Sequence, residues 1–144
     1  KKRTLKEKLM RSFDKHFGIM SLIEGGMSIK EMNTLLNDVI KSDYYSAKYP
    51  VKIKKPFKNK KITQDKLHKK IDSFLSGSNE SERRIVLFGT KVHWTLVHSI
   101  SDNKLELFDS SGRSFYLTSS ITTKTKTSSY FVTPGDIYFL SSRA

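Results

Sequence analysis

The hydrophobic period changes once along this 144-residue chain, between residues 77 and 84. Before that point apolar residues recur every three or four positions, which is the spacing of an amphipathic helix, and after it they alternate or run continuously, as in strands. Helices followed by strands are typical of α+β folds rather than of alternating βαβ units. We therefore expect an α+β fold in which N-terminal helices, within about residues 1–76, pack on an antiparallel sheet formed by residues 84–144.

Two capping boxes mark helix starts in the first half. Thr4 is followed by Glu7, and Ser28 by Glu31, at the spacing that lets each side chain bond the backbone of the other residue. A third apolar stripe lies after Pro50 and Pro56, which bound a short alternating segment. The sequence predicts helices over about 4–16, 28–41 and 64–76, and a strand at about 50–55.

The third expected helix lies between Thr63, its predicted cap, and Gly77, its predicted end. Beyond it, apolar runs are separated by turn residues, which favours consecutive antiparallel strands. With 36% hydrophobic residues, the chain is long enough to bury one core, so we expect a single domain over residues 1–144. The expected strands are 84–89, 93–100, 104–109, 113–118 and 136–142, with a polar connection at 119–129.

Most of the positive charge lies in one window. Residues 48–70 hold ten lysines, no arginine and one acid, Asp65, so they carry nine of the 13 net positive charges. Lysine offers a diffuse charge without the planar fork that reads base edges. Three interpretations stay open: a solvated edge strand and helix, a surface for nucleic acid or another polyanion, and a site for an acidic protein such as an inhibitor or immunity protein. The candidate basic patch is Lys52, Lys54, Lys55, Lys58, Lys60, Lys61, Lys66, Lys69 and Lys70.

The chain contains no cysteine, which excludes disulfides, cysteine-ligated metals and a thiol nucleophile within these residues. Two of the four histidines, His93 and His98, fall on opposite faces of one expected strand. The other two, His16 and His68, lie on expected helix surfaces and have no ligand partner three or four positions away. We therefore expect no metal site and no cofactor.

No apolar run reaches the roughly 20 residues of a membrane helix, so no membrane span is expected. The start on Lys1-Lys2-Arg3, without a signal peptide, is typical of a domain excised from a longer polypeptide. Two locations stay open: the cytoplasm, and secretion or delivery as part of a larger protein.

One pair of residues suggests chemistry. If the hairpin over 93–109 turns at residues 101–103, and paired residue numbers sum to 204, Thr95 faces Asp109, and His93 lies diagonally beside Asp109 on the same face. A carboxylate that orients a histidine forms half of a nucleophilic triad. In the simpler alternative, Asp109 only begins a turn with its side chain. Trp94, the only tryptophan, either packs in the core or walls a substrate subsite.

Residues 89–112, GTKVHWTLVHSISDNKLELFDSSG, resemble the His and Asp segment of papain-like cysteine peptidases of the bacteriocin-processing, double-glycine-leader type. PGDIYFLSSR resembles the closing strand of that family, and GGMSIKEMNTLLNDVIK its helix after a glycine-rich bend. The resemblance implies a papain-like fold in which His93 is the general base and Asp109 orients it. The family's nucleophilic Cys, preceded by an oxyanion-stabilising Gln, opens a helix that this chain lacks. Either that helix lies before Lys1, or the chain is a binding pseudoenzyme.

Three functional hypotheses follow. The first is a papain-like domain for peptide or amide hydrolysis or acyl transfer, acting on a peptide or protein as the effector of a bacterial toxin, with its Cys supplied from elsewhere. The second is a basic nucleic-acid-binding or RNase-type toxin domain that uses the lysines together with His93 or His98. The third is a non-enzymatic pseudopeptidase that binds a peptide along a sheet edge.

Overall fold

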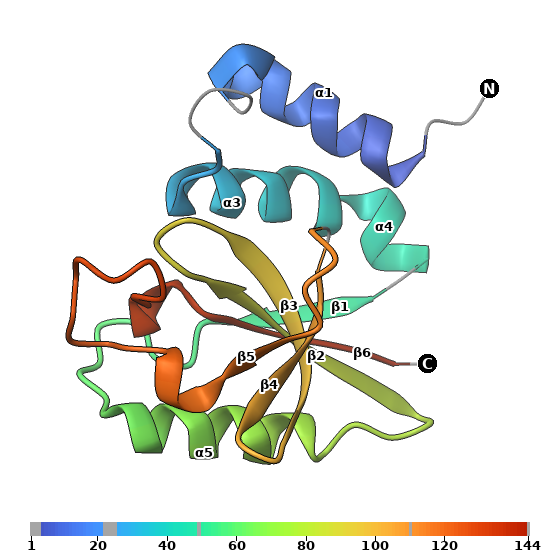
Figure 1. Cartoon of the computed structure of the whole chain (residues 1–144). Helices are drawn as coiled ribbons and strands as arrows, with labels where there is room; N and C mark the ends of the chain where they lie inside the picture. Colours follow the sequence, from blue (N-terminus) through green and yellow to red (C-terminus); the bar gives the residue numbers. More distant parts are fainter. Residues whose placement is uncertain (1–3, 22–25, 49, 110, 144) are drawn as a thin grey trace. The chain divides into compact units, whose positions relative to one another are not determined.

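The chain divides into two compact units, residues 1–51 and residues 52–144. Figure 1 shows their secondary structure in a computed structural model. The N-terminal Lys1-Lys2-Arg3 and Gly25, the first glycine of the glycine-rich bend, lie outside the described residues. The single domain over residues 1–144 stays a prediction. The structure describes residues 4–21, 26–48, 50–109 and 111–143.

The described part of the first unit is helical, and both capping boxes are present. The Thr4 hydroxyl accepts from the Glu7 backbone while the Glu7 carboxylate accepts from Thr4 N, and Ser28 and Glu31 repeat the arrangement. These side chains satisfy amides that a helix start leaves without partners. Its helices are α1 (Leu5–Phe17), α3 (Ile29–Leu35), the π-helix η1 (Leu36–Ile40) and α4 (Asp43–Lys48).

Two features of this unit differ from the sequence expectation. The helix expected at 28–41 changes to π-helical bonding at Leu36, and a further helix, α4, lies before β1 in a segment whose tyrosines favoured extended structure. On this helix both tyrosines contact Lys8, whose ammonium lies 4.2 Å from the ring centre of Tyr44 and 4.7 Å from that of Tyr45. This contact within the unit stabilises the tyrosines on a helix.

The second unit confirms the α+β class. Its sheet has the order β1-β6-β2-β3-β4-β5, and the pairings of β2 with β3 and β6, of β3 with β4 and of β4 with β5 are all antiparallel. Helix α5 lies along one face of this sheet (Figure 1). The elements are β1 (Val51–Lys54), α5 (Gln64–Leu75), β2 (Glu82–Gly89), β3 (Trp94–Ser101), β4 (Lys104–Phe108), β5 (Phe115–Leu117), β6 (Tyr138–Arg143) and 3-10 turns at Thr118–Ser120 and Pro134–Asp136.

The core lies between α5 and the sheet. Three leucine and isoleucine side chains from one face of α5 meet the strand residues that point toward the helix. Phe139 of β6 joins this core by stacking on Phe74, with ring centres 4.2 Å apart. The fully or nearly fully buried members include Leu67, Ile71, Leu75, Val86, Phe88, Val97, Leu105, Leu107, Tyr116, Ile121, Val132 and Ile137.

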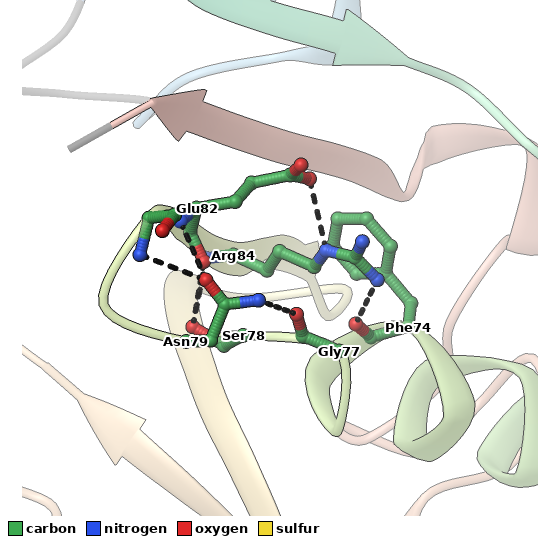
Figure 2. Close-up of polar contacts among 7 residues, drawn as sticks. Phe74, Gly77, Ser78, Asn79, Glu82 and Arg84 are labelled. Carbon is green, nitrogen blue, oxygen red and sulfur yellow. Dashed lines mark hydrogen bonds and ion pairs between the residues drawn. The ribbon is translucent and has the colours of Figure 1, made fainter.

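The ends of α5 differ in detail from the prediction. Thr63 occupies the N-cap position, but its side chain makes no capping bond. Gly77 follows the helix, yet its φ is not positive, so the reason for glycine is space. A Cβ at Gly77 would lie 1.9 Å from Nη1 of Arg84. Arg84 donates to the carbonyl of Phe74 at 3.1 Å and to Glu82 at 3.0 Å, tying the helix end to β2 (Figure 2).

Two expected strands are shorter or shifted. The strand expected at 113–118 covers only residues 115–117, because the preceding residues form the turn after β4, in which Leu107 N donates to Ser114 O at 2.9 Å. The final strand starts at Tyr138 because Pro134–Asp136 forms a 3-10 turn. The other strands keep their expected places within one or two residues.

The β3–β4 hairpin has the expected register at its open end for an unexpected reason. Asp102 and Asn103 have φ values of 48° and 59° and form a two-residue turn, which pairs residues whose numbers sum to 205. A bulge between Val97 and Ser99 then shifts the pairing to a sum of 204. Without this extra residue in β3, His93 and Asp109 would lie on opposite faces of the sheet.

Candidate functional site

His93 is the last residue before β3 and lies at the end of a tight connection from β2. Its carbonyl accepts hydrogen bonds from the backbone and the hydroxyl of Thr90, at 2.8 and 3.2 Å. The next residue, Lys91, donates its backbone N–H to Phe131 at 2.9 Å. These bonds fix the backbone of His93, and so limit the positions its imidazole can take.

The structure brings His93 and Asp109 together. Nε2 of His93 lies 2.5 Å from Oδ1 of Asp109, which directly follows β4. The Asp109 side chain is 1% exposed, whereas the His93 side chain is 33% exposed. The carboxylate is therefore shielded from water while one side of the imidazole stays accessible.

The second oxygen of Asp109 is also bonded. Oδ2 accepts from the backbone N–H of Ser111 at 3.3 Å and from its hydroxyl. Asp109 thus forms the side-chain turn considered above and the pair with His93 at the same time. Ser111 was not identified from the sequence, although the turn pattern of residues 109–112 contained the signal.

Burial raises the pKa of Asp109, but the hydrogen bonds from Ser111 and His93 outweigh it, and the pKa falls to about 2. Asp109 is therefore an acceptor at neutral pH, so Nε2 of His93 must be the donor. The neutral imidazole then carries its lone pair on Nδ1. Within the described residues, no hydrogen bond engages Nδ1. The arrangement can accept a proton at Nδ1 and stabilise the resulting imidazolium.

Trp94 packs against its own sheet. A Cβ on Gly89 would lie 2.9 Å from the Trp94 ring, so glycine is required for the indole to cover β2. The ring centre of Tyr138 lies 6.3 Å away. Burial raises the pKa of Tyr138 to about 12, with a smaller contribution from Asp136. These contacts account for the position of Trp94, and its role as a subsite wall stays a prediction.

The first unit contains another histidine–aspartate pair, which the sequence did not suggest. Nε2 of His16 lies 2.5 Å from Oδ2 of Asp38, and the Ser12 hydroxyl bonds the same oxygen at 3.2 Å. Both partners of the pair are open to solvent, with side chains 35% and 41% exposed. They line a groove of about 940 Å³. Spacing rules along one helix missed the pair because Asp38 lies 22 positions from His16.

His68 is not on a helix surface, as the sequence predicted, but half-buried on α5. Burial lowers its pKa, and Asp65 opposes the effect. Among the residues that the structure describes, no three His, Cys, Asp or Glu side chains gather so as to hold a metal ion. No helix in the described ranges is both long enough and apolar enough to cross a membrane.

The predicted basic patch is mostly exposed. Lys52 and Lys54 project from β1, which is an edge strand, while Lys55 is half-buried with its ammonium 5.1 Å from the ring centre of Tyr138. The remaining six are exposed on the connection to α5 and on that helix: Lys58, Lys60, Lys61, Lys66, Lys69 and Lys70.

Comparison with known proteins identifies no relative. The chain matches no protein-family model, no curated protein and no solved structure.

Proposed function

We propose that the second unit is a papain-like acyl-transfer domain in which His93 is the general base and Asp109 orients it. The observation that carries this proposal is the buried carboxylate of Asp109, 2.5 Å from Nε2 of an accessible imidazole. A base held by one ring nitrogen, with the other free, has the arrangement that a triad needs. The resemblance of residues 93–112 to papain-like cysteine peptidases points to the same roles.

The proposed chemistry requires a thiol from outside these 144 residues, because they contain no cysteine. Nδ1 of His93 would take the thiol proton, and the thiolate would attack a peptide carbonyl. The imidazolium, stabilised by Asp109, would return the proton to the leaving amine. Water would then release the acyl group, with His93 again acting as base. The thiol-bearing segment belongs either to the same polypeptide or to a partner chain.

The decisive experiment starts from the complete natural reading frame that encodes these residues. We would incubate its product with a peptide library, detect cleavage by mass spectrometry, and measure alkylation of its thiols by iodoacetamide. His93→Ala should reduce cleavage by about 10²–10⁴-fold, the usual contribution of a general base, and should slow alkylation of one thiol. His16→Ala is the matched control and should leave both unchanged.

Two results would overturn this assignment. One is a reading frame that encodes no cysteine, together with a product that does not cleave peptides even when its natural partner proteins are added. The other is a product that cleaves peptides at the same rate with His93→Ala as without the substitution.

A second candidate function is the binding of a polyanion such as nucleic acid, favoured by the eight exposed lysines of the basic patch. Its test is the affinity for single-stranded RNA as a function of salt concentration. A linear fall of log affinity with log salt, made shallower by Lys66→Ala and Lys69→Ala together, would support binding through these lysines. An affinity unaffected by salt would contradict it.

A further inference from the structure

A groove of about 600 Å³ lies directly beyond Asp109 on the second unit. Its lining includes Ser111, Arg113, Tyr116 and Tyr130, and we call it the Arg113 groove. Ser111 belongs both to this groove and to the site described above, because its hydroxyl bonds Asp109. A ligand in the groove would therefore lie close to the His93 pair.

Arg113 is held in place by two tyrosines. Its Nη1 donates to the Tyr130 hydroxyl at 2.9 Å, and its guanidinium carbon lies 5.4 Å from the ring centre of Tyr116 and 6.0 Å from that of Tyr130. The two rings pack edge to face at 5.5 Å. A guanidinium has five N–H donors, and the bond to Tyr130 uses one of them. Arg113, which is exposed, thus keeps further donors for an acceptor on a ligand.

The guanidinium of Arg113, on the wall of the groove, favours an anionic group. A guanidinium binds a carboxylate through two parallel hydrogen bonds, and little side-chain entropy is lost when the fork is already oriented. The nearby carboxylate of Asp109 does not take up these donors, because its side chain is 1% exposed and both of its oxygens already accept hydrogen bonds. Its negative charge still interacts with Arg113 and offsets part of the attraction for an anion. Ser111 and Ser120 add hydroxyls to the groove wall.

We propose that the Arg113 groove binds a carboxylate of the peptide on which the site acts, so that His93 acts next to an acidic residue or a chain end. That the bound peptide is a substrate of His93 rests on the proposed function, whereas carboxylate binding by Arg113 does not. A carboxylate on a peptide comes either from an acidic side chain or from the C-terminus, and both offer the same two oxygens.

Binding can be measured on the full 144-residue chain without any assay of activity. Three small probes distinguish the sources: N-acetyl-glutamate N-methylamide for a side-chain carboxylate, N-acetyl-alanine for a terminal carboxylate, and N-acetyl-glutamine N-methylamide as the neutral match. Each would be titrated while the Nε–Hε signal of Arg113 is followed by NMR. We expect at least one acidic probe to move this signal in a saturable way and the neutral probe to leave it unmoved.

Two variants test the geometry. Arg113→Lys keeps the charge but loses the fork, so the affinity for the acidic probe should fall about tenfold, followed through the backbone amide of residue 113. Tyr130→Phe keeps the ring but removes the oxygen that holds Nη1, and a fall of about threefold is expected. Arg83→Lys, at an exposed position of β2, is the control and should not change the affinity.

The proposal is overturned if the neutral probe binds as tightly as the acidic ones, or if Arg113→Lys binds the acidic probes as the unchanged chain does. These outcomes are independent of catalysis. Weakened binding in Arg113→Lys together with unimpaired cleavage in His93→Ala would leave the groove standing while the acyl-transfer assignment failed.

Discussion

Among the residues that the structure describes, each unit contains one histidine–aspartate pair, and the two contacts have equal lengths. Nε2 lies 2.5 Å from a carboxylate oxygen in both the His93–Asp109 pair and the His16–Asp38 pair. The Asp109 side chain is 1% exposed, and its second oxygen is bonded to the Ser111 turn, while Asp38 is 41% exposed. Of these two pairs, only the one in the sheet unit has a carboxylate that is shielded from water and has hydrogen bonds to both of its oxygens.

A short distance between Nε2 and a carboxylate oxygen therefore does not by itself define a candidate site. An exposed pair exchanges one set of hydrogen bonds for another with water, so its net contribution is small. A buried carboxylate has no such alternative and depends on its two partners. The comparison can be tested by stability measurements that need no substrate.

The largest expected effect is the loss of the buried carboxylate. Asp109→Ala leaves the partners of both carboxylate oxygens without an acceptor, so the free energy of unfolding should fall by about 2–3 kcal/mol. Asp38→Ala, at the exposed pair, should lower it by about 0.5 kcal/mol or less. Urea denaturation of both variants gives the two values. Equal losses would remove the distinction between the pairs.

Acid should affect the buried pair within a defined window. The pKa of Asp109 is lowered from 3.8 to about 2 in the folded chain, so the unfolded chain binds a proton more readily. The stability that this carboxylate contributes is present above about pH 4 and is lost as the pH falls toward 2. Asp109→Asn should flatten the stability profile in this window. A wild-type slope in Asp109→Asn would contradict the assigned shift.

A smaller effect is expected from the residue that holds the second oxygen. Ser111→Ala removes the hydroxyl bond but leaves the backbone bond to Asp109, so the free energy of unfolding should fall by about 1 kcal/mol. The acid window should also move upward, because the hydroxyl is a principal cause of the low pKa of Asp109. Ser12→Ala, which removes the matching hydroxyl at Asp38, is the control with little expected change. Carboxyl NMR titration measures the pKa, and an unmoved Asp109 titration in Ser111→Ala would be evidence against this role.

The smallest expected difference between the two pairs is the effect of salt on the coupling energy of the histidine with the aspartate. Double-mutant cycles at about 0.05 M and about 1 M NaCl should show the coupling of His16 with Asp38 falling by a few tenths of a kcal/mol, because exposed charges are screened. The coupling of His93 with Asp109 should change less, since the carboxylate is shielded. A coupling that falls more steeply at the buried pair would show that solvent reaches it.

Much of the fold was predictable because its signals are local. The capping boxes at Thr4 and Ser28, and the change from helical to alternating apolar spacing, depend on residues a few positions apart. Helix α4 was not predictable in this way, since Tyr44 and Tyr45 favour strands and their helix is stabilised by Lys8, 36 and 37 positions earlier. The π-helical continuation from Leu36 likewise had no local signal that we recognised.

The site was predictable in part. The expected sum of 204 placed His93 beside Asp109, and the structure has that register at the open end of the hairpin. The route was different, because a two-residue turn and a bulge near His98 together give the shift that we had assigned to a longer turn. A bulge has no sequence signature comparable to an Asx turn, since it depends on how both strands pack.

By itself, the sequence determined the order of helices and strands, the absence of a thiol in these residues, and the two residues that the candidate site brings together. Each of these follows from composition or from interactions between near neighbours. Only the tertiary structure decided that Asp109 is buried, that Ser111 bonds it, and that Arg113 contacts two tyrosines. Burial and orientation depend on side chains that meet through the folding of distant segments, and residue spacing along the chain does not specify them.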